Sequence, residues 1–160
     1  MLVATDFSEP SIRALARARV LARQTSADLL VVHVLEHVLA LDDLGGEPRP
    51  DVSSVNVSLE ASARRQLEGI VDEPDRRDLN ARTLLVKASS AAHGILTAAA
   101  DTQAELVVVG THGRTGLSHL FGGSVAEAVV RRAPCSVLVV RDRSHSPTTT
   151  TTTTTTTKAG

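Results

Sequence analysis

The chain has 160 residues with 42% hydrophobic content, a formal net charge of −1, two Phe and no Trp or Tyr. These values fit one globular domain whose core is built from Val, Leu, Ile and Ala. They argue against a nucleic-acid partner, because such proteins use a basic surface and aromatic side chains that stack on the bases.

Cys135 is the single cysteine, so an internal disulfide is excluded and a reducing compartment is expected. No apolar run reaches the roughly 20 residues of a membrane span, and no charged-then-apolar leader opens the chain. We therefore expect a cytoplasmic protein without a membrane partner.

Short apolar runs without strict alternation predict strands that are covered on both faces, as in a parallel sheet. They are residues 2–4, 29–34, 83–86, 106–109 and 137–140. Between them, apolar residues recur at helical spacing. The predicted helices are residues 8–24, 52–71, 90–102 and 124–132. The apolar face of the first is Ala14, Ala18, Leu21 and Ala22, and that of the second is Val55, Leu59, Ala63, Leu67, Ile70 and Val71. The third has its apolar face on Ala92, Ile95, Leu96 and Ala99.

Strands that alternate with helices require crossover connections, and these predict a doubly wound α/β fold with helices on both faces of a five-stranded parallel sheet. The segment 37–51 contains Gly45-Gly46 and two prolines, and we interpret it as a loop. The domain is expected to span residues 1–141. Residues 142–160 include ten consecutive threonines, 148–157, and we predict a disordered tail.

A glycine-rich segment lies between the fourth strand and the last helix and includes Gly110, Gly113, Gly123 and Ser124. Glycine allows the backbone to approach a ligand closely, and the free N–H groups of a helix start attract anions. Ser124 can cap the helix and donate its hydroxyl to a phosphate oxygen. This strand, loop and helix therefore predict a phosphate-binding site, although the segment matches neither a P-loop nor a dinucleotide fingerprint.

The spacing Gly110-x2-Gly113-x9-Gly123-Ser124 resembles the ATP-binding motif of the universal stress protein family. The resemblance continues through residues 2–8 at the start and 132–141 at the end. It implies strand order 3-2-1-4-5, as in adenine nucleotide alpha-hydrolase-like folds. It also implies ATP, with magnesium, as cofactor, a stress-response signalling role, and a homodimer whose last strands pair antiparallel across a two-fold axis.

The residues expected to bind nucleotide are Ala4, Thr5, Asp6, Val34, Gly110, Gly113, Arg114, Gly123, Ser124 and Val125. The resemblance sets Asp6 against the adenosine and the backbone of Val34 against the adenine edge. Asp6 is otherwise a cap or turn residue before the first helix, and Arg114 is otherwise a solvent-exposed loop arginine. Ala4 departs from the family, which usually has proline there.

Catalytic and metal-binding residues are not expected. His112 and His119 have no carboxylate in the loop beside them, and Ser124 has no Ser-His-Asp context. The main hypothesis is therefore a nucleotide-binding module with an unknown downstream partner. The alternatives are a slow ATPase or nucleotidyl-transfer enzyme, and a nucleotide-free dimerisation module of the same family.

Overall fold

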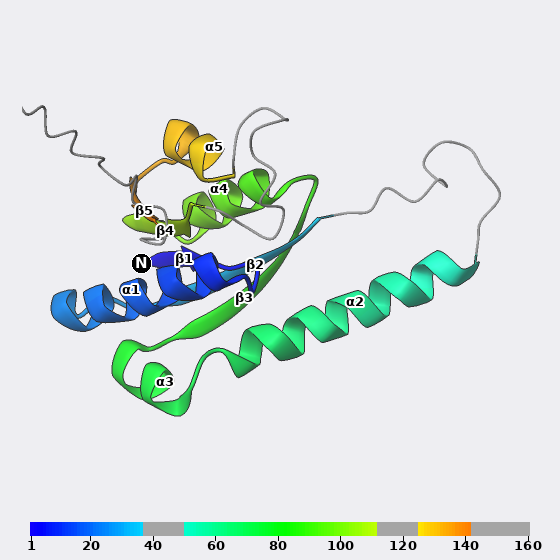
Figure 1. Cartoon of the computed structure of the whole chain (residues 1–160), viewed down its shortest axis with the longest axis horizontal. Coiled ribbons are helices and arrows are strands. Elements are labelled where there is room, and N and C mark those ends of the chain that lie inside the picture. The colour runs from blue at the N-terminus through cyan, green and yellow to red at the C-terminus, as the bar shows by residue number, and fades with distance from the viewer. Residues whose placement is uncertain (37–49, 112–124, 142–160) are drawn as a thin grey trace, which may run out of the picture.

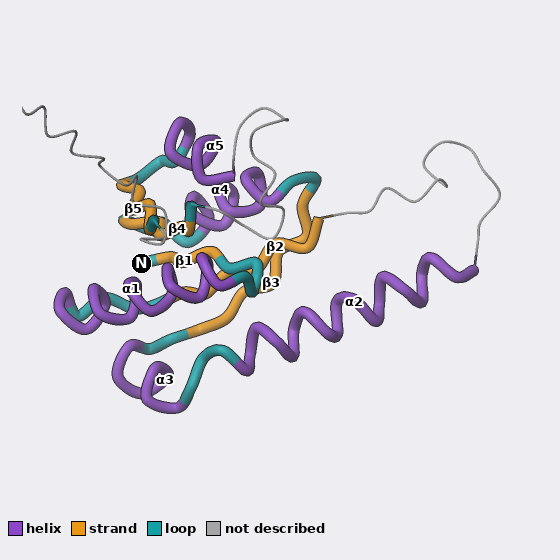
Figure 2. The backbone as a smooth tube through the Cα atoms, in the orientation of Figure 1, coloured by secondary structure: helices purple, strands orange, loops and turns teal. Residues whose placement is uncertain are grey.

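The computed structural model describes residues 1–36, 50–111 and 125–141, with the side chains of 50–56 left out. Its parallel sheet has the order β3-β2-β1-β4-β5, which confirms the predicted doubly wound architecture (Figures 1 and 2). The elements are β1 (Leu2–Ala4), α1 (Glu9–Thr25), β2 (Leu30–Glu36), α2 (Pro50–Gly69), α3 (Glu73–Leu79), β3 (Arg82–Ala88), α4 (Ala91–Asp101), β4 (Leu106–Gly110), α5 (Val125–Arg132) and β5 (Ser136–Val140).

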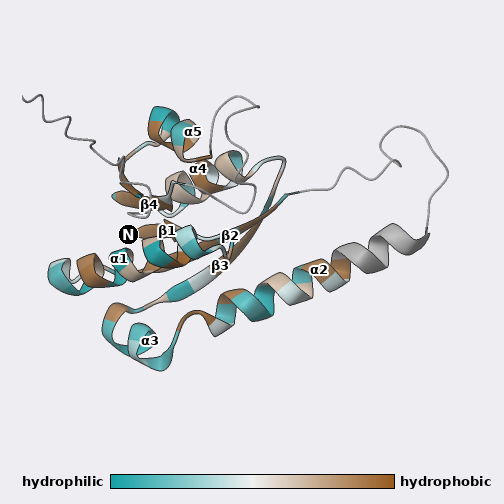
Figure 3. Ribbon diagram, in the orientation of Figure 1, coloured by the Kyte–Doolittle hydropathy of each residue, from teal (hydrophilic) through white to brown (hydrophobic). Residues whose placement is uncertain are grey.

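Helices cover the two faces of the sheet in two groups. In Figure 1, α4 and α5 lie on one side of the strands, and α1, α2 and α3 lie on the other. Each side has its own buried cluster, one centred on Leu15, Val31 and Val108 and the other on Val32, Val107 and Val129. In Figure 3 the central strands are coloured as hydrophobic, whereas helices such as α1 carry both hydrophobic and hydrophilic residues. Strands buried on both faces explain why their sequences do not alternate.

The helix α1 follows its sequence pattern closely. Ala14, Ala18 and Ala22 are fully buried, so the small side chains let the helix lie close to the sheet. Pro10 lies in the first turn, where its missing N–H costs no helical hydrogen bond. The helix ends at Thr25, and its C-cap residue Ser26 adopts a left-handed conformation with φ of 54°.

The helix α2 departs from the prediction in two ways. It begins at Pro50, inside the segment that we interpreted as a loop. Its predicted apolar side is buried only in the later part, at Ala63 and Leu67, whereas Leu59 is 47% exposed. Figure 1 shows the reason, since the early part of α2 extends past the strands that the later part covers. Helical periodicity predicts the face of a helix, but not how far the sheet extends beneath it.

The sequence analysis missed α3, which fits between α2 and β3. Its N-terminus is capped by the Asp72 side chain, which accepts a hydrogen bond from the Asp75 N–H at 2.8 Å. Pro74 occupies the first turn. These are ordinary helix-start signals, but seven residues with buried side chains only at Asp75 and Leu79 are too few to show a 3.6-residue period.

The described residues contain no helix that is both long and apolar enough to span a membrane. The sheet topology places β1 between β2 and β4, with Ala4 opposite Val32 and Val3 opposite Val108. The winding direction therefore reverses between β1 and β4, and the carboxyl ends of these two strands meet there. In open α/β sheets, such a reversal point is where ligands bind.

Candidate functional site

The site at the carboxyl end of β1 is built on the turn of residues 5–8, which leads into α1. One hydrogen bond closes the turn, from Phe7 N to Thr5 Oγ1 at 3.0 Å. Two more link it to the helix: Thr5 Oγ1 to Ser11 Oγ at 3.0 Å, and Ser11 Oγ to the Ser8 carbonyl at 2.9 Å. The carbonyl can only accept, so the Ser11 proton points to it, and Thr5 donates to Ser11. The Thr5 hydroxyl therefore receives one hydrogen bond and donates another.

The backbone of Thr5 is also paired. Its N–H donates to the Val32 carbonyl at 2.9 Å, and its carbonyl accepts from His33 Nδ1 at 2.8 Å. Thr5 is only 5% exposed. Each of its polar groups has an intramolecular partner, so its role in the described structure is to shape the turn.

Asp6 lies half-buried at the centre of this turn. Its Oδ1 accepts from the N–H of Ser8 at 3.1 Å and from the Ser8 hydroxyl. The structure thus shows the turn-forming role that the sequence left open. Ser8 occupies the N-cap position of α1 but makes no side-chain cap of its own, because its hydroxyl is directed to Asp6.

Gly110 ends β4 beside this turn. A Cβ atom there would lie 2.8 Å from the Pro10 carbonyl oxygen and 3.2 Å from Ser11 N. These are backbone atoms, which cannot move away as a flexible side chain can. Glycine is therefore needed to let β4 end against the first turn of α1, and this packing reason holds whether or not a ligand also contacts Gly110.

Val34 lies in β2, and its side chain packs into the core. A Cβ on Gly94 of α4 would lie 2.7 Å from Val34 Cγ1, which shows how closely the two residues are packed. Beyond Val34, the Glu36 carboxylate accepts from Ala91 N at 2.6 Å, and Ser90 caps α4 by accepting from His93 N at 3.3 Å. The start of α4 is thus satisfied by the protein itself.

Charged side chains pair at the carboxyl end of β3. Lys87 Nζ lies 2.5 Å from Glu60 Oε2, and Arg64 Nη2 lies 3.3 Å from Glu60 Oε1. The hydrogen bond from Lys87 is the largest cause that lowers the pKa of Glu60, and Arg64 adds to it. Lys87 therefore ties β3 to α2.

The predicted residues are only partly brought together. Ala4 ends β1 and Gly110 ends β4 at the reversal point, and Thr5 and Asp6 lie in the turn that follows β1. Val34 lies on the neighbouring strand β2, and Val125 begins α5 with 43% of its surface exposed. Gly113, Arg114, Gly123 and Ser124 lie outside the described residues, as do His112 and His119. Within the described ranges, the site therefore consists of the β1 turn and the ends of β2 and β4.

Two residues of the site were missed, Ser11 and His33. A serine in a first helical turn and a histidine in an apolar strand carry no distinctive sequence signal, because their partners are set by the tertiary fold. Among the described side chains, no group of three or more His, Cys, Asp or Glu residues could hold a metal ion. Two surface depressions, of about 270 and 300 Å³, lie at the opposite end of the strands, near their amino ends, beside Asn80 and beside Arg82.

Comparison with known proteins identifies the family. The sequence model of the universal stress protein family matches residues 1–141. The chain belongs to this family. A universal stress protein from Thermus aquaticus is 37% identical over 147 residues, which cover 88% of this chain and 97% of that protein. Universal stress protein YxiE from Bacillus subtilis is 32% identical over 145 residues, with coverage of 88% and 97%.

Solved structures of the family share this fold. A universal stress protein family member from Burkholderia pseudomallei has a TM-score of 0.67 and 30% identity, covering 87% of this chain and 92% of that one. Two further structures, each 23% identical and covering 87% of this chain and 94% of their own, are complexes. One holds cAMP, with a TM-score of 0.61, and the other, from Archaeoglobus fulgidus, holds dAMP, with a TM-score of 0.58.

Proposed function

We propose that this universal stress protein binds an adenine nucleotide, ATP with magnesium, at the carboxyl ends of β1 and β4, and that it acts as a nucleotide-dependent signalling module of the cytoplasmic stress response. The observation that carries the proposal is that β1 and β4 pair at the reversal point of the sheet, so that the Asp6 turn follows β1 where Gly110 ends β4 against the first turn of α1. The family complexes with cAMP and dAMP support the choice of an adenine nucleotide.

The described residues fit such a ligand by their chemistry. Asp6 is a half-buried carboxylate that can accept from the hydroxyl groups of a ribose, and the backbone at Val34 can bond the edge of adenine. Gly113, Arg114, Gly123 and Ser124, which lie outside the described residues, would hold the phosphates. Because the described residues offer no cluster of metal ligands, we propose that magnesium binds through the phosphates.

Mass analysis of the molecules released from denatured, purified protein tests which nucleotide is bound. Calorimetric titration with ATP, AMP and cAMP then measures the affinities. Gly123→Val would place a branched side chain where phosphate must approach the backbone, so we expect affinity for ATP to fall at least about tenfold with little loss of stability. Unchanged affinity in this variant would remove the phosphate-binding role of the loop.

We propose that turnover of ATP is very slow or absent. The chain lacks the His-x-Gly-His and Ser-Gly-Gly-x-Asp-Ser motifs of adenylyl-transfer enzymes, and binding without an activated nucleophile lowers the barrier little. A steady-state phosphate release of about 1–1000 per second that copurifies with the protein would contradict this proposal.

We also propose a homodimer through β5, which is an edge strand of the sheet. The Val140 carbonyl accepts from Thr111 N at 3.0 Å, so the backbone groups of Val140 face β4. Backbone groups alternate along a strand, and those of Val139 therefore point to the free edge.

This alternation gives a matched pair of variants. Val139→Pro removes an outward N–H and should convert dimer to monomer while the fold survives. Leu138→Pro removes an inward N–H and should destabilise the sheet itself. Light scattering at about tens of micromolar protein decides the matter. A wild-type monomer would refute the dimer, and loss of dimer on deleting residues 148–160 alone would move the interface to the tail.

A further inference from the structure

His33 is a buried imidazole in β2 that the proposed nucleotide contacts do not include. It is 9% exposed, and its Nδ1 lies 2.8 Å from the Thr5 carbonyl oxygen. Because a carbonyl oxygen can only accept, Nδ1 carries a proton and donates to it. One side chain thus joins the interior of β2 to the turn that follows β1, across 28 residues of sequence.

The same ring contacts the other side of that turn. The rings of Phe7 and His33 lie 4.4 Å apart between centroids, with an angle of 35° between their planes. Phe7 has a φ of 63°, in the left-handed region that a bulky side chain rarely adopts. Such a conformation persists only where the surroundings hold it, and here the imidazole packs on the ring while Thr5 Oγ1 accepts from the Phe7 N–H.

Asp6 lies in the sequence between Thr5 and Phe7, and both of these residues are held in place. Thr5 is held through its carbonyl and Phe7 through its ring, so the direction of the Asp6 side chain depends on both. We propose that His33 is a positioning residue for the nucleotide site: the hydrogen bond from its Nδ1–H to the Thr5 carbonyl is the main contact that holds the turn of residues 5–8 in the shape that presents Asp6 to the ligand, and the packing of its ring on Phe7 is secondary. This inference rests on the proposed nucleotide-binding function.

Two substitutions separate the two contacts of His33. His33→Asn retains an N–H donor near the position of Nδ1 but has no ring to pack on Phe7. His33→Phe retains a ring but has no donor, which leaves the Thr5 carbonyl without its side-chain partner. We expect His33→Phe to weaken ATP binding about tenfold, and His33→Asn to retain most of the affinity.

Val31→Ala is the matched control, because Val31 is a fully buried residue of the same strand and the same core cluster as Leu15. If His33 only packs in the core, the affinity for ATP should fall in proportion to the melting temperature in all variants. Positioning predicts that Val31→Ala loses stability while keeping its affinity for ATP, and that His33→Phe loses more affinity than its stability explains. If His33→Phe does not fold, His33→Gln is used in its place. The longer Gln side chain carries its N–H donor past the position of Nδ1, so this variant also removes the donor from that position.

Amide hydrogen exchange in the nucleotide-free protein gives a second measurement that needs no ligand. His33→Phe should speed exchange of the Phe7 and Ser8 amides, and Val31→Ala should not do so selectively. Wild-type affinity and exchange in His33→Phe, or an equal loss of affinity in His33→Asn, would overturn the proposal. A wild-type protein that binds no adenine nucleotide, yet shows faster exchange in His33→Phe, would reject the proposed function while supporting the hold of His33 on the turn.

Discussion

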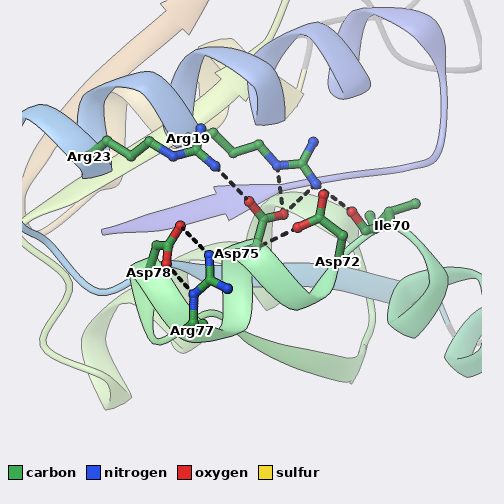
Figure 4. A network of polar contacts seen from close by, with 7 residues as sticks. All are labelled: Arg19, Arg23, Ile70, Asp72, Asp75, Arg77 and Asp78. Atoms are coloured by element: carbon green, nitrogen blue, oxygen red, sulfur yellow. Dashed lines mark hydrogen bonds and ion pairs between the residues drawn. The ribbon is translucent and has the colours of Figure 1, made fainter.

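The two ends of α1 each carry a polar network, and the networks are built differently. At its start, hydroxyl and imidazole groups link Thr5, Ser11 and His33 without ion pairs. At its other end, the fully buried Asp75 accepts from Arg19 Nε at 2.8 Å and pairs with Arg23 at 3.4 Å, while Arg19 also donates to the Ile70 carbonyl at 2.6 Å (Figure 4).

This difference indicates a division between the two networks: one stabilises the fold and the other shapes the site. The second network joins α1 to residues more than 50 positions away and ties α3 to α1. Buried ion pairs of this kind are costly to break. The first network joins mostly near neighbours and determines the shape of one turn. We therefore expect changes at the α3 end to affect stability alone, and changes at the turn to affect both stability and nucleotide affinity.

The largest expected effect is that of Asp75→Ala. It leaves two guanidinium groups without their carboxylate and should lower the free energy of unfolding by about 3 kcal/mol. The loss should not be larger, because Arg19 is partly exposed and can recover some hydration. Urea unfolding measures this loss. Asp78→Asn, on the same helix but in an exposed pair with Arg77, is the control and should change stability little. Weaker ATP binding in folded Asp75→Ala would break the proposed division.

Gly110→Ala should follow, with a loss of about 2 kcal/mol, because its methyl group would press on the Pro10 backbone. Gly69→Ala is the matched control: no atom lies within 4 Å of the added Cβ, and the change should stabilise by about 0.5–1 kcal/mol. Thermal unfolding compares the two. Equal effects would show that β4 does not end as tightly against α1 as the structure indicates.

Thr5→Val should cost about 1 kcal/mol, because it keeps the shape of the side chain but removes the hydroxyl that bridges Phe7 and Ser11. Unlike Asp75→Ala, it should also weaken ATP binding. Denaturant unfolding and calorimetry on the same preparation give both values. A loss of stability with affinity unchanged would show that the turn can relax without moving Asp6.

The smallest effect concerns Glu60, whose pKa Lys87 and Arg64 lower. A lowered folded-state pKa means that the stabilisation is present above the unfolded value of 4.5 and is lost as pH falls through the folded one. The stability difference between wild type and Glu60→Gln should therefore shrink from neutral to acidic pH. Because the Glu60 side chain is partly exposed to solvent, high salt should reduce this stability difference too. A difference that is independent of pH would remove the ion pair as its cause.

The sequence predicted the elements whose signals are local. Apolar runs such as that of β4 and small-residue faces such as that of α1 carry their own evidence, and the family motif supplied the strand order. What it missed depends on tertiary neighbours. In the sequence, Asp75 looks like any acidic residue of a helix, because its partner Arg19 is brought beside it only by the fold. His33 likewise looks like any core residue, because the turn after β1 reaches it only in the folded chain.

The Phe7–His33 contact offers a practical consequence as well. The chain contains no Trp or Tyr, so the protein itself absorbs very little near-ultraviolet light. A retained purine would therefore dominate the spectrum of the purified protein. A tryptophan in place of Phe7 would be the sole indole of the molecule, seated on the imidazole beside Asp6. Its emission would report occupancy and turn conformation together, without any label.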